Sequence, residues 1–233
     1  MVLVASACQA AAPKATATPT TPPTPTTIPA LFSDDFSGEQ LNWKSFPMVA
    51  GQPKVADGTA HFTLSAAGLA VAAAAGATLP QDVVVESDVT IANDAGTQVF
   101  GVACRLEQTF NGKGYLFYVG KFDAAADRVA GISIYDPTSE TGTNLVEQTL
   151  DGDLLTVKDL HLQAQCIGTK LFLLINGQNI VGIDDSTLST GADAGMFAYG
   201  NGYNAEILFD NFVVRAPTAD QSAAARLPTL KAP

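Results

Sequence analysis

Short runs of alternating apolar and polar residues fill the sequence from residue 31 to residue 216, and turn-forming Gly, Asn and Asp residues separate them. Such runs, rich in β-branched and aromatic residues, are typical of strands, whereas helical periodicity is nearly absent. The runs lie at residues 31–36, 60–64, 83–91, 98–107, 114–122, 128–135, 158–167, 170–175, 178–184, 194–199 and 205–215. This pattern predicts an all-β domain, an antiparallel sandwich of two sheets.

Two turns between these runs have clear signatures. Asn176 and Gly177 form an Asn-Gly pair, which favours a two-residue hairpin turn because both residues tolerate positive φ. Gly168 and Thr169 separate the preceding pair of runs in a similar way. We expect a hairpin at each of these positions.

The side-chain alternation of the strands around two cysteines assigns each cysteine to a face. Cys104 shares its side of the strand with Phe100, Val102 and Leu106, and Cys166 shares its side with Leu160, Leu162 and Ala164. Both cysteines therefore lie on apolar faces, and we predict a buried disulfide between them. The opposite side of the two strands is polar, and we predict a ligand-binding face there that includes Arg105, His161, Gln163 and Gln165.

The composition limits the partners that this chain can have. A formal net charge of −11 with twelve Lys and Arg among 233 residues leaves no basic stripe for phosphate groups. We therefore expect neither nucleic acid nor an anionic lipid surface as a partner. No apolar run reaches the length of a membrane-spanning helix, since glycines interrupt the Ala-rich stretch at residues 66–77.

The first eight residues resemble the lipobox of bacterial lipoproteins. An apolar run at residues 2–4 is followed by small residues and then by Cys8, which the resemblance implies is lipidated. Ala5 stands where the lipobox usually has Leu, and the charged start of a signal peptide is missing, so we expect the true start to lie upstream or the sequence to be trimmed. The resemblance implies attachment to the extracellular face of a bacterial membrane, with an ordinary cysteine near the terminus as the alternative.

Residues 9–30 alternate Thr and Pro, a composition that favours an extended linker rather than a folded core. At about 3.1 Å per residue, such a linker holds a domain up to roughly 70 Å from a membrane. Its threonines are candidates for O-linked sugars. Residues 217–233 are rich in Ala and Pro, and we expect them to form a flexible tail.

Four segments of the predicted domain resemble the concanavalin A-like jelly rolls. They are FSDDFS at residues 32–37 with Trp43 shortly after, GVACR at 101–105, LLING at 173–177 and FDNFVV at 209–214. Within that superfamily the chain is most similar to laminin-G-like and 3-keto-disaccharide-hydrolase-like domains of bacterial surface proteins. The resemblance covers residues 31–216 and implies a two-sheet antiparallel jelly roll in which the first and last strands are adjacent.

The same resemblance implies a calcium ion, because laminin-G-like and lectin members of the superfamily often hold one at loop ends. The candidate ligands are Asp34, Asp35 and Asp210, which come close together if the first and last strands pair. The alternative role for these residues is turn and cap chemistry. We expect no other cofactor.

The sequence gives little support for catalysis. Laminarinase-like members of the superfamily carry Glu-x-Asp-x-x-Glu, and here Glu86 and Asp88 are followed by Ile91 at the third acidic position. Glycoside hydrolysis needs two carboxyl groups across the sugar, so we expect Glu86 and Asp88 to lie on the solvent face of a strand instead. The two histidines, His61 and His161, lie in no hydrolase or metal motif.

Aromatic residues near Gly-rich turns indicate a binding function. Together with the polar face, four residues are candidates for a carbohydrate-binding groove: Tyr135, Tyr199, Asn201 and Tyr203. Tyr is also common as a half-buried strand residue. The sequence therefore favours a non-catalytic surface lipoprotein module that binds extracellular or cell-wall carbohydrate, or an envelope protein. A structural or accessory subunit of a membrane or filament assembly is the main alternative, and a divergent glycoside hydrolase is the third.

Overall fold

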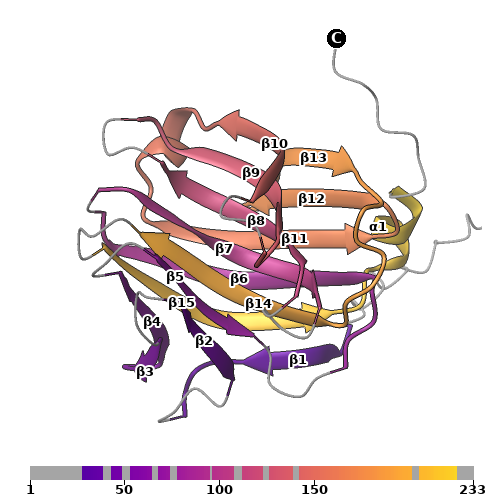
Figure 1. The fold of residues 1–233 in the computed structure, drawn as a ribbon, viewed down its shortest axis with the longest axis horizontal. Coiled ribbons are helices and arrows are strands. Elements are labelled where there is room, and N and C mark those ends of the chain that lie inside the picture. Colours follow the sequence, from indigo (N-terminus) through magenta and orange to yellow (C-terminus); the bar gives the residue numbers. More distant parts are fainter. Residues whose placement is uncertain are drawn as a thin grey trace, which may run out of the picture.

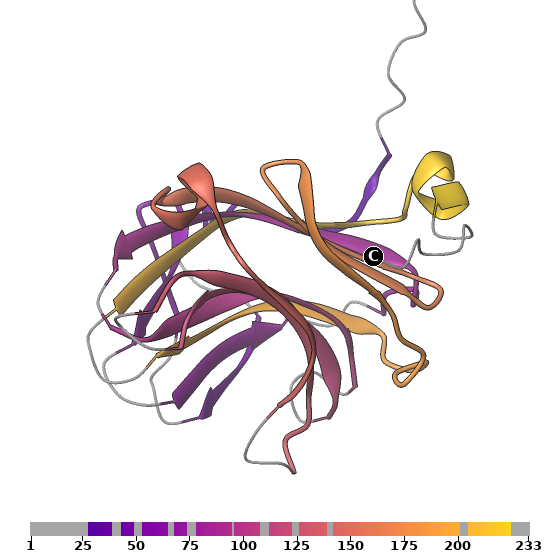
Figure 2. The ribbon, with the colours of Figure 1, turned by 90° about the horizontal axis from the view of Figure 1, so that it is seen from above.

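The computed structural model describes residues 28–38, 43–48, 53–64, 68–73, 78–94, 96–107, 112–122, 126–138, 142–200 and 205–224. These residues form two antiparallel sheets packed face to face, the predicted jelly-roll sandwich (Figure 1). Figure 2, a view from above, shows the two layers one over the other. Cys8, the Thr/Pro linker up to residue 27 and residues 201–204 lie outside the described residues. Within the described part, no helix has the length and hydrophobicity of a membrane span.

The eight-stranded sheet contains the first and last strands of the domain. Its strands are β1 (Ala30–Asp34), β3 (Lys54–Ala56), β4 (Thr59–Leu64), β6 (Val83–Asn93), β11 (Asp159–Ile167), β12 (Lys170–Ile175), β13 (Gln178–Asp184) and β15 (Ala205–Arg215). Their order is β13-β12-β11-β6-β15-β4-β3, and β1 also pairs with β15. The pairing places Phe32 beside Val214 and Asp34 beside Phe212, which confirms that the first and last strands are adjacent.

The seven-stranded sheet has the order β10-β9-β8-β7-β14-β5-β2. Its strands are β2 (Lys44–Met48), β5 (Gly68–Ala73), β7 (Gln98–Leu106), β8 (Gly114–Lys121), β9 (Val129–Tyr135), β10 (Thr143–Thr149) and β14 (Asp193–Gly200). Both predicted hairpins are present in the other sheet: Gly168 has φ 57°, and Asn176 and Gly177 have φ 51° and 77°. Positive φ at both central residues is the geometry that an Asn-Gly turn provides.

The core lies between the sheets, and the strand alternation decides which side chains enter it. On β6, Val85, Val89 and Ile91 are buried, while Glu86 and Asp88 lie on the outer face, as predicted. At one end of the core, Trp43 packs edge-to-face on Phe212 with ring centroids 4.6 Å apart. The sandwich thus has one continuous apolar interior made by the inner faces of both sheets.

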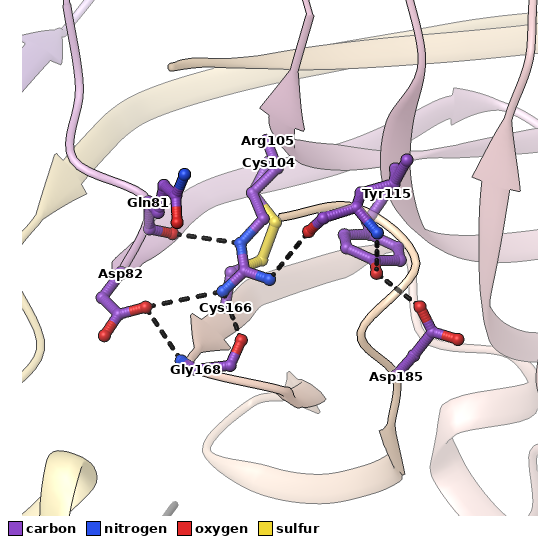
Figure 3. The surroundings of a disulfide bond; sticks show 9 residues. Gln81, Asp82, Cys104, Arg105, Tyr115, Cys166, Gly168 and Asp185 are labelled. Carbon is purple, nitrogen blue, oxygen red and sulfur yellow. Dashed lines mark hydrogen bonds and ion pairs between the residues drawn. A yellow bond between two sulfur atoms is a disulfide. The ribbon is translucent and has the colours of Figure 1, made fainter. Parts of the chain in front are cut away.

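The predicted disulfide links the two sheets. Cys104 lies on β7 of the seven-stranded sheet and Cys166 on β11 of the eight-stranded sheet, and both are fully buried (Figure 3). Both cysteines lie on inner faces, as the strand alternation predicts. The bond fixes the spacing and register of the layers at one point of the core.

The described part of the expected tail contains a short helix, α1 (Ala219–Ala224). Thr218 and Gln221 form a reciprocal capping box: the Gln221 backbone N–H donates to Thr218 Oγ1, and the Thr218 N–H donates to Gln221 Oε1. Gln221 Oε1 also accepts a hydrogen bond from Arg215 at the end of β15. These contacts attach α1 to the eight-stranded sheet.

Candidate functional site

The residues predicted to bind a ligand lie in three different places in the structure. Arg105 is inside the sandwich, His161, Gln163 and Gln165 lie on the outer face of the eight-stranded sheet, and Tyr135 and Tyr199 lie on the outer face of the seven-stranded sheet. Asn201 and Tyr203 are outside the described residues. The prediction that Arg105 shares one polar face with the β11 residues is therefore wrong.

A β-bulge explains why Arg105 is not on the expected face. In the pairing of β14 with β7, Asp193 lies opposite Leu106 and Gly195 lies opposite Ala103, so Cys104 and Arg105 together oppose one residue. Arg105 has φ 50°, in the left-handed region. The extra residue shifts the alternation, so Leu106 packs on the outer face instead of beside Cys104.

The Arg105 side chain is only 4% exposed, and its guanidinium group connects three loops of the sandwich (Figure 3). It donates to the carbonyl oxygens of Gln81 at 3.3 Å, Leu188 at 3.1 Å and Gly168 at 2.5 Å. A 3.5 Å ion pair with Asp82 adds a charged partner. With its donors engaged in the interior, Arg105 stabilises the loops next to the disulfide and does not face solvent.

The outer face of the eight-stranded sheet, here called the polar face, carries polar and charged side chains that hydrogen-bond to one another. His161 Nδ1 lies 2.7 Å from Asp88 Oδ1. Gln163 donates to Glu86, which also accepts a hydrogen bond from Arg215 at 2.7 Å. Because these side chains are each other's partners, the face is a satisfied network, and a ligand here has to replace existing hydrogen bonds.

The three candidate calcium ligands do not form a metal site. Asp34 accepts hydrogen bonds from the Phe36 backbone N–H at 2.8 Å and from Trp43 Nε1 at 2.7 Å. Asp35 accepts from Ser37, and Asp210 accepts from the next backbone N–H of the chain. Among the residues that the structure describes, no three His, Cys, Asp or Glu side chains are grouped to hold a metal ion. Turn and cap chemistry accounts for these aspartates, and they do not fit a calcium ion.

The outer face of the seven-stranded sheet is apolar and aromatic, and we call it the aromatic face. Alternation places it opposite the core: where Phe100 and Val102 of β7 enter the core, Val99 and Ala103 do not. A second apolar cluster forms there, separate from the core. It consists of Val99, Ala103, Leu106, Tyr118 and Phe197, with Leu116, Val129 and Tyr135 packed against it.

Glycines let the large side chains of the aromatic face lie flat on the sheet. Gly131 of β9 pairs with Tyr118 of β8, and a Cβ at Gly131 would be 2.4 Å from Cζ and Oη of the Tyr118 ring. The ring therefore lies across Gly131 and reaches β10, where its hydroxyl donates to Glu147 Oε2 at 2.6 Å. Only a glycine leaves room for this arrangement.

Two exposed rings border this cluster. Phe122, directly after β8, is 56% exposed and meets the Tyr118 ring edge-on with centroids 5.8 Å apart. Tyr199 of β14 is 37% exposed and pairs with Val99, on the same face as Phe197 two residues earlier. The third exposed large hydrophobic side chain in the described residues, Leu31, belongs to the other sheet. Exposed aromatic surface is thus concentrated on the aromatic face.

Polar side chains lie along the other side of this face. The register of β10 with β9 places Glu147 opposite Gly131 and Asn144 opposite Ser133, and these positions alternate with core residues such as Ile132. Asn144 and Glu147 are exposed. The face therefore runs from aromatic rings on β14 and β8 to hydrogen-bonding groups on β9 and β10.

Sequence analysis missed Tyr118, Phe122, Ser133 and Glu147 as site residues. The missed signal is Gly131, a glycine inside the buried strand β9, since such a glycine marks a site that another group approaches closely. Alternation alone identifies two faces of a strand, but Gly131 indicates the face on which the Tyr118 ring lies.

Burial and carboxylate partners set the acidity of the tyrosines. Burial and the hydrogen bond to Asp185 raise the pKa of Tyr115 to about 12. Burial and the hydrogen bond to Glu147 raise the pKa of Tyr118, and burial with the nearby Asp136 charge raises the pKa of Tyr135. A tyrosine whose pKa is higher in the folded state than in the unfolded state contributes stability at pH values below its unfolded-state pKa. This contribution is lost as the pH rises through its folded-state pKa.

We therefore expect incomplete tyrosine ionisation in the folded protein at about pH 11, where exposed tyrosines are largely ionised. Phenolate absorbance should account for at most three of the five tyrosines at that pH. In concentrated urea all five should ionise together near about pH 10. Identical titration curves in the two conditions would contradict the packing of Tyr115 and Tyr118.

Comparisons with known proteins identify the fold and no family. No protein-family profile matches the sequence, and no curated protein matches it. Among solved structures, the exoplasmic/lumenal domain of VIP36, in a form with Ca²⁺ and Man3GlcNAc bound, has a TM-score of 0.58 at 11% identity, covering 87% of this chain and 95% of that one.

Two further solved structures show how varied the proteins with this fold are. The CBM2 module of the evolved Dit of Lactobacillus casei BL23 phage J-1 has a TM-score of 0.57 at 13% identity, covering 79% of this chain and 94% of that one. An endo-β-1,3-glucanase from Pyrococcus furiosus has a TM-score of 0.56 at 12% identity, covering 81% of this chain and 94% of that one. At these identities the likeness establishes the fold alone: the chain is an antiparallel jelly-roll sandwich of two sheets.

Proposed function

We propose that this chain binds carbohydrate through its aromatic face, as a non-catalytic module attached by Cys8 to the outer surface of a bacterial membrane. The observation that carries the proposal is the concentration of exposed aromatic rings on one sheet face, next to exposed hydrogen-bonding side chains. The polar face, by contrast, is occupied by hydrogen bonds among its own side chains.

The aromatic face matches the two kinds of surface that a sugar ring presents. A pyranose has C–H groups across its flat side and hydroxyl groups around its rim. Phe122 and Tyr199 offer exposed rings for the C–H side. Ser133, Asn144 and Glu147 offer donors and acceptors for the hydroxyls, and a few placed polar groups in an apolar site are what fixes the orientation of a small ligand.

Two of the similar structures support this choice, since one is described as a carbohydrate-binding module and one was solved with a bound mannose-containing glycan. The lipobox-like start and the Thr/Pro linker support a surface location on a stalk. The resemblance to laminin-G-like and 3-keto-disaccharide-hydrolase-like domains agrees with an extracellular role.

The arrangement of the carboxylates supports binding rather than hydrolysis. Glu86 and Asp88, which come nearest to the laminarinase-like pattern, lie on the polar face and are paired with Arg215 and His161. They are therefore on the opposite side of the sandwich from the exposed rings. Catalysis by these residues would need a sugar on the polar face instead.

The proposal is tested by glycan-array binding of the full chain, with and without calcium, followed by hydrolysis assays on every glycan that binds. We expect binding without turnover. Phe122→Ala and Tyr199→Ala should each weaken binding about fivefold to tenfold, the effect of one lost stacking contact. Leu31→Ala is the matched control, because Leu31 is equally apolar and exposed but lies on the other sheet.

Three results would contradict the proposal. Binding that Leu31→Ala weakens as much as Tyr199→Ala does would indicate nonspecific adhesion. Binding that is lost only with His161→Ala would place the ligand on the polar face. The absence of binding to any glycan would favour the alternative of a docking subunit in an envelope assembly.

A further inference from the structure

Glu147 is an acidic group on the aromatic face, and a hydrogen bond from Tyr118 holds one of its carboxylate oxygens. It lies on the edge strand β10 opposite Gly131, and its Oε2 accepts the 2.6 Å hydrogen bond from Tyr118. Tyr118 is only 4% exposed and its ring lies across Gly131, so its hydroxyl cannot move freely. One oxygen of the carboxylate is thus anchored while the side chain as a whole remains exposed to solvent.

The charge of Glu147 is not neutralised by a neighbour. In the described residues, no Lys, Arg or His forms an ion pair with it, whereas Glu86 pairs with Arg215 and Asp94 pairs with Lys121 and Arg128. Tyr118 contributes a hydrogen bond but no positive charge. A ligand lying on the aromatic face therefore meets the negatively charged Glu147 carboxylate, which has one oxygen without a hydrogen bond from Tyr118 and no ion-pair partner among the described residues.

We infer that Glu147 makes the aromatic face selective for glycans that carry free amino groups over glycans that carry carboxyl groups. This inference rests on the proposed function. An ammonium group is both a cation and a triple donor, so it satisfies the open Glu147 oxygen better than a hydroxyl does. A sugar carboxylate at the same place is repelled by a like charge. Tyr118 is the positioning residue, since it sets where that charge lies.

The test compares oligomers of β-1,4-linked glucosamine with the same oligomers in N-acetylated form and with oligogalacturonate, using isothermal titration calorimetry on the full chain at low salt. The amino form should bind about tenfold more tightly than the N-acetylated form, as expected for one charge contact near a protein surface. Oligogalacturonate should bind most weakly. Physiological salt should reduce the preference, since exposed charges are screened.

Glu147→Gln should make the amino and N-acetylated oligomers bind almost equally. Asp159→Asn is the matched control: it removes one exposed carboxylate from the acidic chain, but on β11 of the other sheet, and it should leave the preference unchanged. This control separates a local contact from the general attraction of a cation to a chain of net charge −11. Tyr118→Phe keeps the charge but frees Glu147, and it should reduce the preference by about half.

The outcomes separate this inference from the proposed function. If neutral glycans bind and the amino oligomer does not, or if Asp159→Asn lowers the preference as much as Glu147→Gln does, the inference is wrong and the proposed function stands. If no glycan binds the wild-type chain, the proposed function is wrong, and the inference falls with it. Circular dichroism of each variant checks that it is folded before its affinity is compared.

Discussion

Replacing both Cys104 and Cys166 with alanine should lower the free energy of unfolding by about 4 kcal/mol, the chain-entropy contribution of a loop of the observed size. The two cysteines are 62 residues apart in sequence, so the bond removes many open conformations from the unfolded chain. It also connects β7 with β11, and without it side-chain packing and the nearby Arg105 hydrogen bonds hold the two sheets together at that point. Urea denaturation of the double variant and the wild type measures the difference.

Thiol counts provide the control for this experiment. The folded chain should resist reduction by a mild thiol, because both sulfur atoms are fully buried, and should be reduced readily once it is unfolded. After denaturation without a reductant, the wild-type chain should show at most one free thiol, which belongs to Cys8. Three free thiols, or a double variant as stable as the wild type, would contradict the disulfide.

The strands that sequence predicts best are those with an inner and an outer face. Alternation identified β6, β7 and β11 because one side of each packs in the core. The missed strands lack that signal for definite reasons. β5 (Gly68–Ala73) is rich in Ala, which has little preference for strands, and β10, β2 and β3 are edge strands. β2 also contains Pro47, which an edge strand tolerates.

The disulfide and the candidate site differ in how far alternation can predict them. For the disulfide it was enough to know that both cysteines point toward the core. For the site it was also necessary to know which strands share a sheet, and this depends on pairing between distant residues such as Val102 of β7 and Met196 of β14. His161 and Arg105 were both assigned to an outer face, but the strands that carry them belong to different sheets.

A single backbone feature explains why Arg105 does not lie on the face that alternation predicts. Alternation requires every residue of a strand to be extended, and one left-handed residue at Arg105 reverses the faces from that point. An arginine in a sequence does not indicate positive φ, whereas the Asn-Gly pair at Asn176 does. The groups that the arginine contacts come from loops that are distant in sequence, so the sequence around Arg105 does not show them.

Replacing Arg105 with methionine should therefore lower the free energy of unfolding by about 3 kcal/mol or more, the usual cost of breaking a buried charged network. Methionine has a similar length and no donors, so the buried carbonyl groups of Leu188 and Gly168 lose their partners. Each unsatisfied buried group costs about 1–3 kcal/mol. Asp82 is 51% exposed, so loss of its ion pair should contribute little.

Urea denaturation of Arg105→Met is best compared with Lys113→Met, a change of the same kind at an exposed site. Lys113 pairs with Asp136 and is 49% exposed, so its replacement should change stability by less than about 0.5 kcal/mol. Equal effects at the two positions would show that Arg105 is not a structural anchor.

Arg105→Gly separates the backbone from the side chain. It removes the same contacts as methionine, but glycine adopts positive φ freely, whereas a side chain there costs about 1 kcal/mol. Glycine leaves the larger void, but the interior next to it is lined by backbone carbonyl groups, which water can satisfy. We therefore expect the glycine variant to be destabilised, but by less than the methionine variant. A glycine variant as stable as the wild type would show that the bulge stands without the guanidinium contacts, and that the side chain follows the backbone rather than determining it.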